Sequence, residues 1–220
     1  MVPTNTAADT TIVLDFETTG LSPDHGERAI EIGAVKLVDG IIVDRFQHLM
    51  YPGKRINSFI ENYTGISNSM LKSAPPCEEV MKQFVEFMGD FTLVAHNASF
   101  DSRFLGAELR RINYPLENIF ACSMLVSRRI YPQAPNHKLG TLVQYRQLPS
   151  DGTFHRALAD AQMTAYLWLE MLKDIKSAHA FDTVPFAVMQ TLSRISRHSV
   201  ASYLDEVAHS QRGPGLGPGR

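Results

Sequence analysis

Residues 11–20 read TIVLDFETTG, and the rest of the chain can be interpreted outward from them. The first six are mainly β-branched or apolar and are followed by a Thr-Thr-Gly turn, which predicts a buried strand. Two more extended stretches follow, Ala29–Val38 and Ile41–Tyr51, separated by Asp39-Gly40. Asp-Gly between two alternating runs is a strong hairpin signal, so we expect an antiparallel meander at the start of the fold.

Helical patterns follow in three segments, Glu78–Met88, Phe100–Ile112 and Ala157–Lys173. A short apolar stretch, Phe91–Ala95, lies between the first two, and Ile119–Cys122 is the candidate for a fifth strand. The order is therefore β-β-β, then α-β-α-β-α. It predicts an α/β fold in which helices flank a mixed five-stranded sheet. This layout is typical of ribonuclease H-like nuclease folds, and the order alone fits other α/β folds too.

We expect one main domain over residues 11–175, preceded by a flexible N-terminus at residues 1–10. The sequence changes character after residue 175. Thr183 and Pro185 predict the start of a helix that runs to about Val207. We therefore expect a helical appendage over residues 176–208. The ending GPGLGPGR predicts a disordered tail over residues 209–220.

The composition is that of a folded soluble protein, with 44% apolar and 20% charged residues in 220. No apolar stretch approaches the roughly 18–20 residues that cross a bilayer, and the first residues do not resemble a secretory signal. Cys77 and Cys122 lie far apart in apolar surroundings. The sequence leaves a disulfide between them as an alternative, but two reduced thiols are favoured. We expect a cytoplasmic protein without membrane contact.

The net charge of −2 argues against a protein that coats DNA, because such a protein carries a broad basic excess. The charge is uneven, since residues 102–150 hold seven basic and two acidic side chains, a balance of +5. Solvated helix faces explain such a run as well as a nucleic-acid surface does. Composition alone leaves the partner open.

Two acids, Asp15 and Glu17, end the first predicted strand. Side chains alternate across a strand, so these two carboxylates point to the same face. A buried pair of like charges is stable only with a cation beside it or with a shared proton. No Lys or Arg lies among the sequence neighbours, so a divalent metal is the favoured explanation. The alternative is an exposed strand end with two ordinary acids.

Two further acids and one histidine stand at the starts of predicted helices. Ser99 is the expected N-cap of the middle helix, which puts Asp101 in the first turn, where the helix dipole favours an ionised carboxylate. Considered by itself, Asp101 is fully explained by this interaction with the helix dipole. Asp160 flanks the apolar stripe of the last long helix, and His155 precedes it by five residues. A histidine near acids is a candidate base, because its pKa lies near working pH.

Three spaced motifs, Asp-x-Glu, Asn-x-x-Phe-Asp and His-x-x-x-x-Asp, span about residues 10–175 in this order. Together they resemble the DEDD exonuclease superfamily, histidine subgroup, and in particular the proofreading epsilon subunits of bacterial DNA polymerase III and their stand-alone relatives. The resemblance implies that His155 is the general base and that two divalent cations are held by four acids: Asp15, Glu17, Asp101 and Asp160. It also implies contacts to the terminal nucleotide from a further set: Thr18, Thr19, Gly20, His96 and Asn97.

Two points qualify the substrate contacts. Phe100 is a candidate for stacking on a terminal base, although core packing is the commoner role of such an aromatic. Gly65-Ile66 resembles the turn before the family's second helix, but Asn62–Thr64 stand where the proofreading subunits often have a histidine. This departure concerns substrate positioning and not the metal site.

The predicted chemistry is two-metal hydrolysis of a phosphodiester. Two hard cations activate water and neutralise developing charge, and oxygen ligands select Mg²⁺ or Mn²⁺. We therefore expect a 3′→5′ exonuclease that releases nucleoside monophosphates from DNA single strands or from frayed and mismatched 3′ ends. The alternatives are an exoribonuclease of the same superfamily and a non-catalytic polymerase accessory module. The expected partners are nucleic-acid 3′ ends, DNA favoured over RNA, and either a polymerase or a second copy of the chain.

Overall fold

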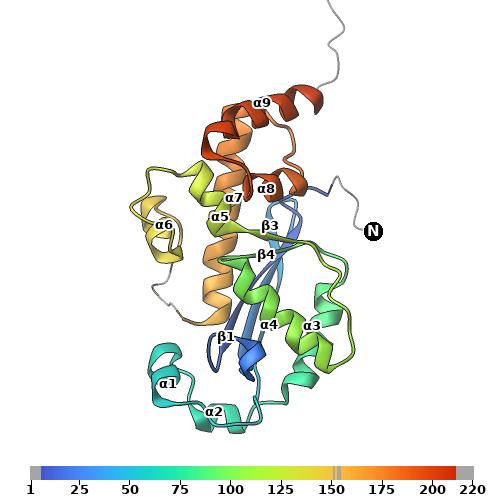
Figure 1. The fold of residues 1–220 in the computed structure, drawn as a ribbon, viewed down its shortest axis with the longest axis vertical. Helices are drawn as coiled ribbons and strands as arrows, with labels where there is room; N and C mark the ends of the chain where they lie inside the picture. Colours follow the sequence, from blue (N-terminus) through green and yellow to red (C-terminus); the bar gives the residue numbers. More distant parts are fainter. Residues whose placement is uncertain (1–5, 151, 153–154, 212–220) are drawn as a thin grey trace, which may run out of the picture.

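The computed structural model describes residues 6–150, 152 and 155–211, and its centre is a mixed sheet (Figure 1). Strands β1 (Thr11–Thr18), β2 (Ala29–Val38) and β3 (Ile41–Leu49) form an antiparallel meander. Strands β4 (Leu93–Ala95) and β5 (Phe120–Cys122) continue the sheet in parallel with β1, in the order β3-β2-β1-β4-β5. The predicted mixed five-stranded fold is confirmed.

The β2–β3 hairpin turns where the sequence predicts it. Asp39 and Gly40 have φ values of 50° and 77°. A two-residue hairpin turn of type I′ needs positive φ at both central positions, and its twist matches that of the strands. The turn sets the register between β2 and β3, and β1 lies in the middle of the sheet between β2 and β4.

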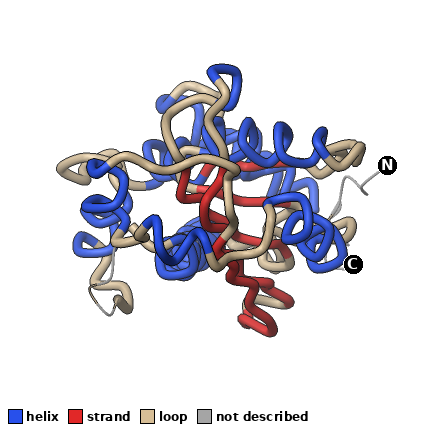
Figure 2. The backbone as a smooth tube through the Cα atoms, turned by 90° about the horizontal axis from the view of Figure 1, so that it is seen from below, coloured by secondary structure: helices blue, strands red, loops and turns tan. Residues whose placement is uncertain are grey.

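Helices cover both faces of the sheet, as Figure 2 shows. One face packs against α3 (Cys77–Met88) and α4 (Ala98–Arg111). The other packs against the long helix α7 (Ala157–His179), together with α5 (Ser123–Ile130) and α6 (Leu139–Tyr145). Each face has its own apolar core, so the sheet is buried on both sides.

Two short helices that the sequence did not predict follow β3. They are α1 (Ser58–Thr64) and α2 (Asn68–Lys72), which lie beyond the N-terminal end of α7 in Figure 1. Together with β2 and the loops beside them, they enclose a small apolar cluster: Ile30, Ile56, Ile66 and Leu71. Helices of seven and five residues are too short to give a readable apolar period, which is why they were missed.

The C-terminal part corrects the prediction of one helix. The chain forms α8 (Phe186–Leu192), a short 3₁₀ turn η2 (Arg197–Ser199) and α9 (Val200–Gln211), and Pro185, not Thr183, precedes α8 as its cap residue. Three serines, at 193, 196 and 199, stand in and beside the break. Serine hydroxyls compete for backbone groups and favour helix ends over helix interiors.

The predicted boundaries also shift. Residues 6–10 are not free, because the Ala8 amide donates to Val184 O and Trp168 Nε1 donates to Ala8 O at 2.7 Å. Helix α7 continues past residue 175, and α9 includes residues 209–211. The rest of the predicted N-terminal segment and tail, 1–5 and 212–220, lies outside the described residues.

Both cysteines are free and buried, as favoured above. Within the described ranges, none of the helices combines the length and the apolar character that a bilayer span requires.

Candidate active site

Asp15 and Glu17 project from the central strand toward α7. The residues between and before them, Leu14 and Phe16, belong to the core on the α3–α4 face. Val13 belongs to the core on the α7 face. Because side chains alternate along a strand, the two carboxylates share the α7 face at the C-terminal end of β1. This is the arrangement that the sequence predicts.

A glycine on the neighbouring strand lets α7 come close to these acids. Gly33 pairs with Asp15 across β1 and β2. A Cβ atom on Gly33 would lie 2.0 Å from the backbone nitrogen of Leu158, in the first turn of α7. The helix therefore begins directly on the sheet beside Asp15. Its first turn carries Asp160, so the glycine brings an acid of α7 to the acids of β1.

Glu17, His155 and Asp160 converge. One ligand atom from each lies within 4.8 Å of the other two. The His155 backbone amide donates to Asp160 Oδ2 at 3.0 Å, and His155 itself has a φ of 61°. The three side chains could share one cation, with the imidazole as a ligand or as a neighbour of the bound ion.

Asp101 reaches the acids at the end of β1 from the opposite face of the sheet. It lies in the first turn of α4, where the structure corrects the predicted cap: Asn97, with a φ of 73°, precedes the helix, and Ser99 lies inside it. Asparagine tolerates this left-handed conformation better than most residues. Asp101 is 2% exposed and its Oδ1 accepts a hydrogen bond of 3.2 Å from the Phe16 amide, between the two acids of β1.

Burial raises the pKa of all four acids, and repulsion from neighbouring carboxylates adds to the rise at Asp15 and Glu17. Burial, followed by repulsion from Asp101 and Asp160, raises the pKa of Asp15 well above its usual value. Burial and Asp160 raise the pKa of Glu17 to about 8. Burial likewise raises the pKa of Asp101 to about 7 and that of Asp160 to about 6. Such a cluster ionises fully only when cations are added to it, so the donor set fits divalent metal ions.

Arg156, a cation that acts electrostatically on Glu17, is already engaged by another acid, a feature that the sequence analysis missed. Arg156 Nη2 lies 2.8 Å from Glu31 Oε1, and the Ala157 amide donates to Glu31 Oε2 at 3.1 Å. Glu31 is fully buried and lies opposite Glu17 in the β1–β2 register. The pair therefore anchors the start of α7 to the sheet. An acid inside the apolar run AIEIGAV was the signal available in the sequence.

Two of the acids, Asp15 and Asp160, lie on the wall of a cleft of about 810 Å³ between α1, α5, α6 and α7. His96, Asn97 and Lys138 line it together with Asp15, His155 and Asp160. His96 hydrogen-bonds with Ser123 Oγ and His137 O, both at 2.9 Å, and burial lowers its pKa to about 4. His96 is therefore a neutral residue on the wall of the cleft.

The remaining residues predicted to contact the terminal nucleotide are the loop Thr18–Gly20 and Phe100. The loop after β1 is fixed by its own hydroxyls, because Thr18 Oγ1 donates to Gly20 O at 2.6 Å and Thr19 Oγ1 donates to Glu27. Phe100 packs against Phe104, with ring centroids 4.9 Å apart, and is not among the residues that line the cleft. The roles of all these residues in metal or substrate binding stay predictions.

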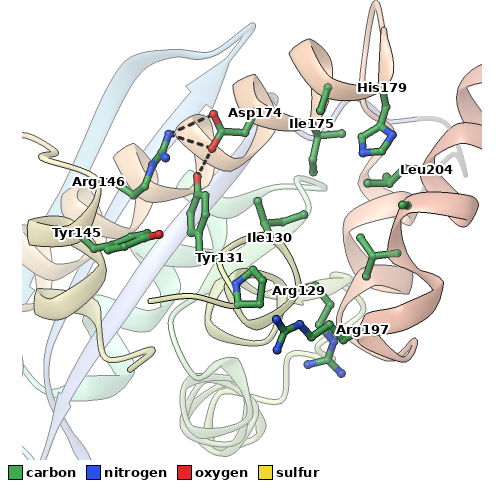
Figure 3. A pocket seen from close by; sticks show the side chains of 14 residues that line it. Arg129, Ile130, Tyr131, Tyr145, Arg146, Asp174, Ile175, His179, Arg197 and Leu204 are labelled. Carbon is green, nitrogen blue, oxygen red and sulfur yellow. Dashed lines mark hydrogen bonds and ion pairs between the residues drawn. The ribbon is translucent and has the colours of Figure 1, made fainter. Parts of the chain in front are cut away.

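A second hollow, of about 500 Å³, lies at the other end of α7, between α5, α6 and α9 (Figure 3). Its carboxylate, Asp174, accepts hydrogen bonds from the Tyr131 hydroxyl at 2.8 Å and from Arg146 Nη2 at 3.2 Å. These groups satisfy one another, and no cluster of acids converges there among the described residues. The cleft at the end of β1 is therefore the candidate active site.

A sheet in this strand order, with acids from both faces gathered at the end of its central strand, defines the class: an α/β nuclease with a ribonuclease H-like fold. Within that class, the chain belongs to the Exonuclease family, whose family model matches residues 12–168. The predicted family is confirmed.

Relatives and a solved structure agree with this assignment. The chain is 41% identical over 175 residues to "DNA polymerase III PolC-type" from Bacillus cereus, covering 77% of this chain and 12% of that protein. It is 34% identical over 194 residues to "3′-5′ exonuclease DinG" from Bacillus subtilis, covering 86% of this chain and 20% of that protein. The chain thus spans only a small part of these relatives. Exonuclease X in complex with 5′ overhanging duplex DNA is similar in structure, with a TM-score of 0.64, 26% identity and coverage of 83% and 98% of the two chains.

Proposed function

We propose that this chain is a metal-dependent 3′→5′ exonuclease that releases nucleoside monophosphates from DNA. The convergence of Glu17, His155 and Asp160 within 4.8 Å, beside the half-buried Asp15 and the buried Asp101, is the observation that carries the proposal. Membership of the Exonuclease family supports it. The names of two relatives, a DNA polymerase III and a 3′-5′ exonuclease, favour DNA and this polarity.

The four acids would hold two divalent cations, Mg²⁺ or Mn²⁺: Asp15, Glu17, Asp101 and Asp160. When bound, these ions would make water nucleophilic and neutralise the charge that develops on the phosphate and the leaving oxygen. His155 would take the proton of the attacking water. The backbone of Thr18–Gly20, with His96 and Asn97 on the cleft wall, would position the terminal nucleotide.

The substrate enters by its end. A terminal 3′-hydroxyl nucleotide would occupy the cleft, so single strands and frayed or mismatched ends would be preferred over firmly paired ends. We also propose a cytoplasmic protein that works beside a polymerase, which the similarity to a segment of PolC-type polymerases supports.

The test is a time course on 5′-labelled oligonucleotides with Mg²⁺ or Mn²⁺. We expect linear single-stranded DNA and mismatched duplex to shorten from the 3′ end, and DNA to be degraded faster than RNA of the same sequence. A strand with a 3′-phosphate, and a circular strand with an internal label, should resist. His155→Ala should lower turnover by about 10²- to 10⁴-fold while cation affinity stays nearly unchanged. Efficient cutting of the circular strand would indicate an endonuclease, and faster loss of RNA would indicate an exoribonuclease.

A further inference from the structure

The imidazole of His155 lies against an aromatic ring from a distant part of the chain. The ring centroids of Tyr63 and His155 are 4.0 Å apart, with planes inclined at 35°. Tyr63 is itself stacked on Phe59, one helical turn earlier, with centroids 5.8 Å apart and planes inclined at 11°. Tyr63 thus lies between an exposed ring and the acid cluster.

Tyr63 belongs to a braced element. The Asn57 side chain caps the start of α1 by accepting from the Ile60 amide. Asn68, at the start of α2, exchanges two hydrogen bonds of 2.9 Å with the backbone of Ile56, and its amide donates to Glu61 at 2.6 Å. The small apolar cluster beneath α1 and α2 adds to this bracing. Tyr63 is therefore presented on a fixed support.

The acid cluster, in contrast, hydrogen-bonds only the backbone of His155, and the imidazole lies near the carboxylates of Glu17 and Asp160 within 4.8 Å. The His155 amide donates to Asp160 Oδ2, but that bond leaves rotation about the side-chain torsions free. Among the residues that the structure describes, the imidazole nitrogens make no hydrogen bond. Attraction to the Asp160 carboxylate draws the imidazole toward the cluster, and the stack on Tyr63 supplies a flat surface that restricts the tilt of the ring.

We propose that Tyr63 is a positioning residue that holds the His155 imidazole over the acid cluster through ring stacking. This inference rests on the proposed function, in which His155 takes a proton from the attacking water. It requires the aromatic ring and not the hydroxyl. Tyr63 would therefore act through His155 and not through the substrate.

Kinetics separate the two roles. The aromatic stack stabilises the positioned orientation of the His155 ring. Tyr63→Ala removes that stabilisation and should therefore lower kcat by about 2- to 12-fold, with KM for the oligonucleotide unchanged. Tyr63→Phe should restore the wild-type kcat. In a His155→Ala background, Tyr63→Ala should cause no further loss, because the ring that it positions is gone. Phe59→Ala is the matched control: it removes an aromatic ring from the same helix face without touching His155, and kcat should stay near that of the wild type.

Two kinetic results would overturn the proposal. One is that Tyr63→Ala lowers activity as much in the His155→Ala background as in the wild type, or that its effect falls mainly on KM. Either outcome would assign the ring to substrate stacking. The other is an unchanged kcat in Tyr63→Ala.

An NMR measurement tests the stack without relying on activity. In the metal-free wild type, ring current from Tyr63 should move the carbon-bound proton signals of the His155 ring upfield, and Tyr63→Ala should abolish that displacement. Signals that do not move would refute the proposal even if the enzyme is active. If the wild type releases no nucleotide, the proposed function fails, and these spectra still decide whether Tyr63 holds the ring.

Discussion

Gly33→Ala tests how the active site is assembled. A Cβ at this position would lie 2.0 Å from Leu158 N and 2.2 Å from Ala157 C, both backbone atoms of α7. Ordinary contact begins at 3.4 Å, so the start of the helix must move away by about 1.4 Å (3.4 minus 2.0). Asp160 would move with it. A misplacement of about 1 Å can cost about 10²-fold in rate, so we expect kcat to fall by about that factor.

Overpacking should also cost about 1–3 kcal/mol of unfolding free energy. Urea denaturation and initial rates on a single-stranded oligonucleotide measure both effects. Gly106→Ala in α4 is the matched control, because its added Cβ would meet its nearest neighbours at 3.6 Å. That variant should keep its activity and gain up to about 1 kcal/mol from the helix preference of alanine. A Gly33→Ala variant with wild-type stability and rate would refute the close-approach argument.

Three further predictions concern charge. Asp15→Asn should abolish hydrolysis and leave the metal-free protein as stable as the wild type or more so, since it relieves repulsion; a large drop in Tm would contradict this. The pKa of Glu17 is raised to about 8, so the folded state binds more protons than the unfolded state above about pH 4.5, and the metal-free protein should lose stability as pH rises from 4.5 to 8. Mg²⁺ should reverse that loss, and a Tm that is independent of pH in this window would be evidence against the buried cluster. Arg156→Met should lower the unfolding free energy by about 2–3 kcal/mol in urea denaturation, because it leaves Glu31 buried without its cationic partner. The double variant Arg156→Met/Glu31→Gln should recover part of this loss. Equal stability of Arg156→Met and wild type would exclude the anchoring role.

The central elements of the fold were predictable because their signals are local. The strands containing Asp15 and Gly33 show β-branched runs, and Asp39-Gly40 fixes the hairpin between β2 and β3. The helix carrying Asp160 has an apolar stripe long enough to read. The short helix that carries Tyr63 has no such period, and the serine-rich break before α9 depends on competition between side-chain and backbone hydrogen bonds that an apolar pattern does not register.

The convergence of the acids could be predicted from the sequence, whereas the contacts that hold the site in place could not. Asp15 and Glu17 are brought to one face by strand alternation, which needs no tertiary information. The anchoring pair of Glu31 and Arg156 joins residues 125 positions apart, so only the packing of α7 on β2 reveals it. The stack of Tyr63 on His155 is non-local in the same way. Phe100 illustrates the opposite limit, because it packs on Phe104 outside the residues that line the cleft, and its contact with a terminal base stays a prediction.

The most direct test of the account is a crystal structure of the protein grown with Mn²⁺ and a nucleoside monophosphate, with anomalous diffraction data. We expect two anomalous peaks at the end of β1, bonded to the carboxylates of Asp15, Glu17 and Asp160, with the phosphate bridging them and the Asp101 carboxylate next to the second ion. Anomalous peaks elsewhere in the molecule, with the four acids free of metal while the nucleotide is bound, would contradict the claim that this cluster is a metal-dependent nuclease site.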